Sequence, residues 1–195
     1  MDDFKFVFKG SLYLFARYVL ICVLVFMTVP LSGILPNILN PILGFFYLFV
    51  LLYFFIFTMW HEGKRDKNRV ETGQLKELKS KGFICAAIVA VFLSIFVVSP
   101  MFFSPDSESV VLTVLAILKT AFCMPIAYLI PVFFNLDVDI ESSYGGNIEN
   151  LTASTILFLI VMAICIISCG IGYISGYKSI QIIEPVKQKV KNLFK

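Results

Sequence analysis

Five apolar stretches separated by polar connections limit most strongly what this chain can fold into. They cover residues 12–35, 41–60, 82–103, 110–134 and 151–177. An α-helix rises about 1.5 Å per residue, so about 20 apolar residues cross the hydrocarbon core of a bilayer, and each stretch reaches that length. Only 15% of the 195 residues are charged, against about 25% in soluble domains. The sequence therefore predicts one helical integral membrane domain, 1–195, embedded in the lipid bilayer.

The polar segment 61–81 predicts how the chain is inserted. It contains seven of the sixteen Lys and Arg residues and lies between the second and third apolar stretches. Cytoplasmic segments of membrane proteins collect Lys and Arg near helix ends. We therefore expect 61–81 to be a solvated basic loop in the cytoplasm, and both basic termini to be cytoplasmic too. The expected location is the cell membrane, as a multi-pass protein, with anionic lipid at the inner face.

The connection 135–151 carries only acidic charge, which predicts an outer loop. Asp137, Asp139 and Glu141 alternate along it, as in some calcium-binding loops. The EF-hand pattern, however, requires Gly at the sixth position and Glu at the twelfth. Counted from Asp137, Ser142 and Ile148 stand there. We expect a solvated acidic loop and no metal.

The stretch 110–134 is the difficult one. It contains Lys119 near its middle, together with Pro125 and Pro131. A lysine inside the hydrocarbon costs about 2.5–3.5 kcal/mol on insertion scales, and interior prolines break the helical hydrogen-bond pattern. A full crossing would also move the basic C-terminal tail outside. The predicted fold is therefore an all-α polytopic transmembrane bundle with four full spans plus one bent or re-entrant apolar segment. The alternative is five full spans.

Two features near the C-terminus predict contacts. Ser168, Gly172 and Gly176 repeat at four-residue spacing, which gives a ridge that another helix can approach closely. The partner helix belongs either to this chain or to a protein partner of the last span, and packing within the chain is the expectation. Residues 184–195 alternate lysines with apolar residues at helical spacing, which predicts a basic amphipathic tail helix on the inner leaflet.

The sequence favours no enzymatic chemistry, and we expect no catalytic residue, metal or cofactor. The single histidine, His61, lies in the polar segment, whereas an intramembrane metalloprotease needs paired His ligands. The five cysteines all lie in apolar stretches, which predicts packing rather than disulfides. The basic segment is explained by its membrane flanks, so no nucleic-acid partner is expected.

Two short patterns carry a resemblance. Trp60, Gly63, Asp66 and Asn68 form W-x-x-G-x-x-D-x-N after the second stretch, and residues 172–178 read G-Y-x-x-G-Y-K at the end of the last. Together they resemble a group of small uncharacterised polytopic membrane proteins of Gram-positive bacteria. The resemblance implies a bacterial membrane protein and carries no activity.

Two functions follow as expectations. The first is a non-enzymatic accessory or interaction component of the membrane, because the spans are rich in apolar residues and poor in ionisable ones. The alternative is the membrane subunit of a small-molecule transporter with a site near Lys119, for which Lys119 and Asp137 are the candidate residues. A simpler interpretation is that Lys119 extends toward the headgroups or takes a carboxylate such as Asp137 as its counter-charge. Intramembrane charge and broken helices often mark substrate sites. The sequence identifies neither a substrate nor an oligomeric state.

Overall fold

The protein is a bundle of helices in a computed structural model, which describes residues 2–32, 39–73, 78–102, 110–134 and 148–178. Four long helices are α1 (Asp2–Ser32), α2 (Leu39–Glu71), α3 (Lys81–Val98) and α7 (Ile148–Tyr177). The shorter elements are the 3₁₀ helix η1 (Ser99–Phe102), α4 (Val110–Cys123), the 3₁₀ helix η2 (Met124–Leu129) and α5 (Ile130–Phe134). The four long helices are long and apolar enough to cross a membrane. The predicted fold class is confirmed.

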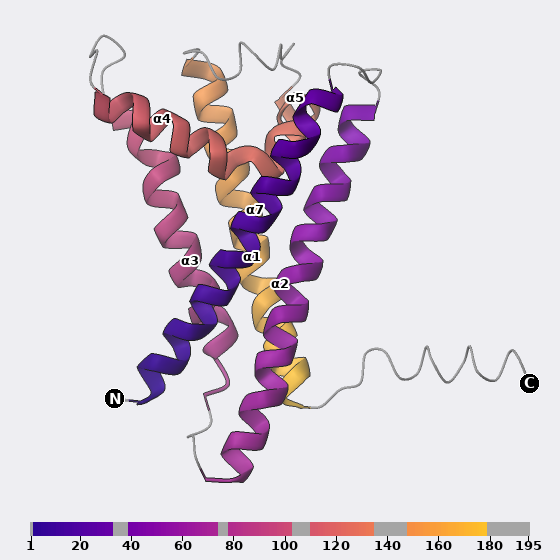
Figure 1. The fold of residues 1–195 in the computed structure, drawn as a ribbon, viewed down its shortest axis with the longest axis vertical. Helices are drawn as coiled ribbons and strands as arrows, with labels where there is room; N and C mark the ends of the chain where they lie inside the picture. Colours follow the sequence, from indigo (N-terminus) through magenta and orange to yellow (C-terminus); the bar gives the residue numbers. More distant parts are fainter. Residues whose placement is uncertain (1, 33–38, 74–77, 103–109, 135–147, 179–195) are drawn as a thin grey trace, which may run out of the picture.

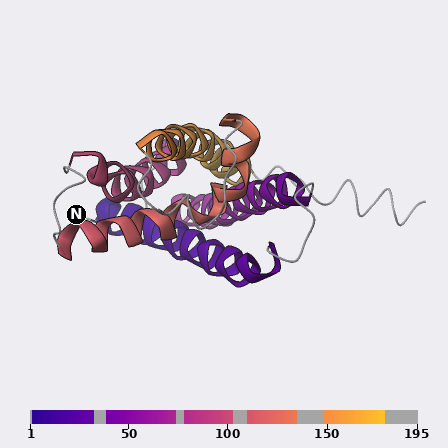
Figure 2. The same cartoon turned by 90° about the horizontal axis from the view of Figure 1, so that it is seen from above.

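The long helices run alternately up and down, and α1 and α7 lie at opposite corners (Figures 1 and 2). Helix α7 packs against α2 and α3, and α1 packs against the same two helices from the other side. The described residues at the start of α1 and the end of α7 lie at the same end of the bundle as the end of α2 and the start of α3 (Figure 1). Four long helices that alternate in direction bring the chain back to the end at which it started, so the start of α1 and the end of α7 share that end.

The core is formed by large apolar side chains from every long helix. Tyr18 of α1, Phe55 of α2, Leu93 of α3 and Phe158 of α7 are 0–1% exposed. The outward faces are also apolar, for example Phe49, which is 68% exposed. An apolar exterior of this extent is the expected surface where the solvent is lipid, because lipid tails are as apolar as the side chains. The chain is a multi-pass membrane protein.

Helix α2 corrects the expectation for residues 61–81. Instead of ending at Trp60, the helix continues to Glu71, so the first half of the predicted solvated loop is helical. Pairs at helical spacing support this extension: Arg65 with Glu62, and Lys67 with Glu71 at 3.8 Å. Two residues beyond the end of the helix, Gly73 turns the chain with a φ of +72°, a conformation that glycine adopts without strain.

The segment 110–134 is bent and stays at one end of the bundle. Helix α4 lies across the end that holds the start of α7, and α5 turns back to the same end (Figures 1 and 2). The α-helix gives way to η2 where Pro125, at the start of the 3₁₀ helix, has no N–H to donate. The prediction of four full spans plus one bent segment is therefore confirmed, and the alternative of five full spans is not supported.

The 3₁₀ helix η2 fills the centre of that end. Its residues Met124, Ile126 and Leu129 are 0–6% exposed. Tyr18 of α1 donates a hydrogen bond to the backbone carbonyl of Phe122, and Tyr47 of α2 stacks on Tyr128 with ring centroids 6.1 Å apart. The bent segment thus closes the bundle with packed apolar side chains.

Candidate functional site

A buried group of charged residues lies at the opposite end of the bundle, between α2 and α3. We call it the ion cluster; its members are Glu62, Arg65, Asp66, Arg69 and Lys81. The Lys81 ammonium donates to Asp66 Oδ2 at 2.5 Å and lies 3.7 Å from Glu62 Oε2. Arg65 pairs with Glu62, and Arg69 lies 3.5 Å from Asp66. The charges of Glu62, Asp66 and Lys81 are buried, and each is compensated by a partner of opposite sign.

The two outer long helices complete the ion cluster. Tyr173 of α7 donates its hydroxyl to Asp66 Oδ2 at 3.1 Å. From α1, the Phe6 ring lies 4.8 Å from the Arg69 guanidinium and 5.9 Å from the Lys81 ammonium, within range for cation–π attraction. All four long helices therefore meet at this cluster. The side chains of Glu62, Asp66 and Lys81 are only 3–8% exposed.

Glycines beside the ion cluster allow this burial. A Cβ atom on Gly63 would lie 2.2 Å from the carbonyl oxygen of Tyr173, and one on Gly82 would lie 2.7 Å from that of Cys169. Any side chain at either position would hold α7 away from α2 or α3. The glycines next to Glu62 and Lys81 thus bring the helices close enough to exclude water from the charges.

The predicted ridge of the last span contributes to the same contact. A Cβ on Gly172 would lie 2.6 Å from the carbonyl oxygen of Ile56, and one on Gly176 would lie 2.0 Å from that of Trp60. These two glycines therefore pack against α2 of the same chain, as expected. Ser168, the third member of the predicted ridge, is half-buried.

The residues of the two short sequence patterns come together in this region. Trp60, Gly63 and Asp66 of the first pattern meet Tyr173 and Gly176 of the second. Sequence reasoning identified both patterns but not their contact. It also treated Glu62 and Asp66 as solvated. The signal that could have found the cluster was the helical spacing of the acidic residues, which places Glu62 and Asp66 on one face.

Lys119, the predicted transport-site residue, lies on α4 and is 5% exposed. Its ammonium donates a hydrogen bond to Thr155 Oγ1 of α7 at 3.0 Å. Asp137, the expected counter-charge, lies outside the described residues, as do most of the predicted acidic loop 135–151 and the tail helix 184–195. Helix α7 begins at Ile148, so the last four residues of the predicted loop, 148–151, are helical instead.

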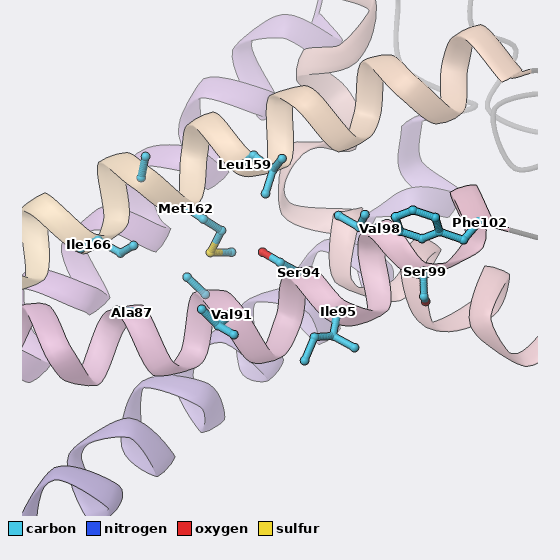
Figure 3. A pocket seen from close by; sticks show the side chains of 12 residues that line it. Ala87, Val91, Ser94, Ile95, Val98, Ser99, Phe102, Leu159, Met162 and Ile166 are labelled. Atoms are coloured by element: carbon cyan, nitrogen blue, oxygen red, sulfur yellow. The ribbon is translucent and has the colours of Figure 1, made fainter.

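A groove of about 610 Å³ runs between α3 and α7 on the outer surface of the bundle; we call it the α3–α7 groove. Five of its twelve lining residues are small, among them Ala87, Ala90 and Ser94 of α3 and Ala163 of α7, and the other seven are larger apolar residues. The Ser94 hydroxyl is directed into the groove, toward Met162 (Figure 3). The groove lies within the two candidate membrane spans, so it opens toward lipid.

The described residues contain no group of three or more His, Cys, Asp or Glu side chains that could hold a metal ion. The five cysteines are buried and free. In comparisons with known proteins, no family model, no curated protein and no solved structure matches this chain. Its role must therefore be inferred from the ion cluster, Lys119 and the α3–α7 groove themselves.

Proposed function

We propose that this protein is a non-enzymatic accessory component of the bacterial cell membrane that binds a transmembrane helix of another membrane protein in the α3–α7 groove. The lining of the groove carries the proposal. Ala87, Ala90 and Ala163 present little side-chain volume, and the Ser94 hydroxyl is directed into the space between the helices (Figure 3). Small residues let helix backbones approach closely in lipid, and serine hydroxyls hydrogen-bond across such contacts.

A helix fits this lining better than a lipid tail does. A lipid acyl chain has no acceptor for the Ser94 hydroxyl and is as apolar as Leu, so it does not favour Ala over Leu at Ala163. A helix gains van der Waals contact where small residues allow close approach. It also offers side-chain or backbone oxygens to a hydroxyl at membrane depth.

The ion cluster supports a non-enzymatic role. Glu62, Asp66 and Lys81 are the kind of residues that serve as acids and bases in enzymes. Here their side chains are 3–8% exposed and bound to one another, which leaves them little access to a substrate. We assign them to holding the four long helices together at one end of the bundle.

We further propose that the end bearing the ion cluster faces the cytoplasm. Lys5, Lys9, Lys64 and Lys79 are exposed at this end, on α1, on α2 and before α3. The bias of Lys and Arg toward the cytoplasm then places both termini there. The bent segment from α4 to α5 faces the outside.

The partner is tested by photo-crosslinking in native membranes. A photo-crosslinking residue replaces Ser94 in the groove and, as a control, Phe49, which is exposed on α2. We expect Ser94 to give one discrete protein adduct and Phe49 to give lipid adducts. Adding Ala163→Leu, which fills the groove from α7, should abolish the adduct, whereas Ala16→Leu on the lipid-facing side of α1 should preserve it.

Three outcomes contradict the proposal. The adduct at Ser94 could survive Ala163→Leu, which would show that the groove is not the contact. The same adduct could form at Phe49, which would show non-specific collision in the membrane. An adduct of two copies of this chain would replace accessory binding by self-association.

The second candidate function is a transporter subunit with its site near Lys119. The observation that favours it is a buried cation on a broken, non-crossing segment. Lys119→Leu should leave membrane insertion intact and abolish uptake of the substrate if this function holds. Unchanged uptake in that variant would eliminate it. Met124, Ile126 and Leu129, in the same bent segment as Lys119, are buried apolar side chains, and their packing favours closing this end of the bundle over providing a path for a substrate. For this reason we place the accessory function first.

A further inference from the structure

We infer that the seam between α1 and α2, beside the ion cluster, binds the phosphate group of an anionic phospholipid. The site consists of Lys9 and Tyr13 of α1 and Arg65 of α2. It lies away from the α3–α7 groove and from Lys119. The inference is therefore independent of which partner or substrate the protein takes.

One face of α1 provides a stripe of cations and an aromatic ring. Lys9, Tyr13 and Arg17 follow one another at four-residue spacing, which puts them on the same side of the helix. The Lys9 ammonium lies 5.8 Å from the centroid of the Tyr13 ring. The Arg17 guanidinium lies 5.5 Å from the ring of Phe54 on α2. The stripe therefore borders α2, which packs beside α1.

Arg65 supplies the other half of the site. Its side chain is 42% exposed and pairs with Glu62 through Nη2. Its Nε is buried and has no hydrogen-bond partner among the residues that the structure describes. Arg65 lies on α2 between Phe54, which contacts Arg17, and Arg69, which contacts Phe6, so it is opposite the part of α1 that carries Lys9 and Tyr13. A buried N–H group is normally paired. Because neighbouring protein atoms cover Nε, a phosphate meets Arg65 at the exposed part of its side chain and pairs with Nε only when that side chain turns outward.

The charges at the seam favour an anion. Within the ion cluster three cations, Arg65, Arg69 and Lys81, face two carboxylates, so one positive charge remains. Lys9 and Arg17 add two more on the adjacent face of α1. Phosphate oxygens accept parallel hydrogen bonds from a guanidinium, and a tyrosine hydroxyl and an ammonium can complete the contact.

The surroundings favour a lipid phosphate over a soluble one. Phe8 is 58% exposed and Leu12 is 56% exposed, and both neighbour the stripe on α1. An acyl chain can lie against these side chains while its phosphate reaches the seam. Arg17, one turn deeper, is a cation on a lipid-facing helix, and such side chains extend toward headgroups.

The test is a titration of the full-length protein, in a neutral detergent, with fluorescent phosphatidylglycerol. Arg65→Lys keeps the charge and the pairing with Glu62 but removes Nε and the planar fork. Lys9→Gln removes an exposed charge without touching the core. We expect each change to weaken phosphatidylglycerol binding about fivefold or more. The matched control is Lys64→Gln, an exposed lysine one residue from Arg65, and we expect a change of less than about twofold.

Competition identifies the source of the phosphate. We expect unlabelled phosphatidylglycerol to displace the probe, and phosphatidylcholine and inorganic phosphate to leave it bound. Equal losses from Lys9→Gln and Lys64→Gln would overturn the inference, because only diffuse attraction would then operate. Wild-type affinity in Arg65→Lys would overturn the role of the Arg65 guanidinium. Displacement by inorganic phosphate at equal concentration would overturn the lipid assignment.

Discussion

The Lys81 ammonium donates a 2.5 Å hydrogen bond to Asp66 Oδ2, joining the first residue of α3 to the C-terminal part of α2. Both side chains are 3–5% exposed. A charge buried to this degree depends on its ion-pair partners. Within the described helices, Asp66 without Lys81 retains only Arg69 at 3.5 Å, and Lys81 without Asp66 retains only Glu62 at 3.7 Å. This contact therefore holds together the end of the bundle where all four long helices meet.

The first prediction concerns this pair. Lys81→Met should destabilise the folded protein by about 3–5 kcal/mol, because Asp66 and Glu62 lose their common cation. Thermal unfolding of the purified protein in detergent measures the loss. The double variant Asp66→Asn with Lys81→Met should cost less than the sum of the two single changes. Lys5→Met, at an exposed lysine of α1, is the control and should change stability little. Additive losses in the double variant would show that the pair does not couple.

The second prediction separates the contribution of α7. Tyr173→Phe removes the hydroxyl that donates to Asp66 and keeps the ring, so we expect a loss of about 1–2 kcal/mol in the same unfolding assay. Tyr53→Phe, at a residue 52% exposed on α2, provides the control. If both variants unfold at the same temperature as the wild type, the Tyr173 hydroxyl contributes nothing to stability.

The third prediction concerns the close contact between α7 and α2. Gly176→Ala should reduce stability by more than about 2 kcal/mol, because the added methyl group would lie 2.0 Å from the carbonyl oxygen of Trp60 and the helices must separate. Ala116→Leu adds a larger group at an exposed position of α4 and should be tolerated. A stable Gly176→Ala protein would mean that α7 can shift along α2 without cost.

The fourth prediction concerns topology and uses an impermeant thiol reagent on intact cells. The native cysteines are buried, so they should react slowly. Thr113→Cys at the start of α4 and Asn150→Cys at the start of α7 should both be labelled from outside, and Ser80→Cys before α3 should not. Labelling of only one of the first two would contradict the re-entrant segment. Labelling of Ser80→Cys alone would reverse the proposed orientation and leave the bent segment intact.

The spans and the bent segment were predictable from the order of residues alone. In lipid, each long apolar stretch is stable as a helix, because the backbone N–H and C=O groups of a helix hydrogen-bond to one another. Lys119 and Pro125 mark the bent segment, since a charge and a missing hydrogen-bond donor both oppose a straight span through lipid. Gly172 and Gly176 likewise indicated a close helix contact, because only glycine allows such an approach.

The ion cluster and the lipid-binding seam depended on tertiary structure. By sequence, Glu62, Asp66 and Lys81 belong to a charged segment that water would normally solvate. Asp66 is 15 residues from Lys81 and 107 residues from Tyr173 along the chain. Local pattern decides whether a residue prefers lipid or water, but a buried charge is stable only where distant partners meet it in space. Helix packing brings those partners together, and for that reason the apolar lengths alone predicted the spans but not the cluster that joins them.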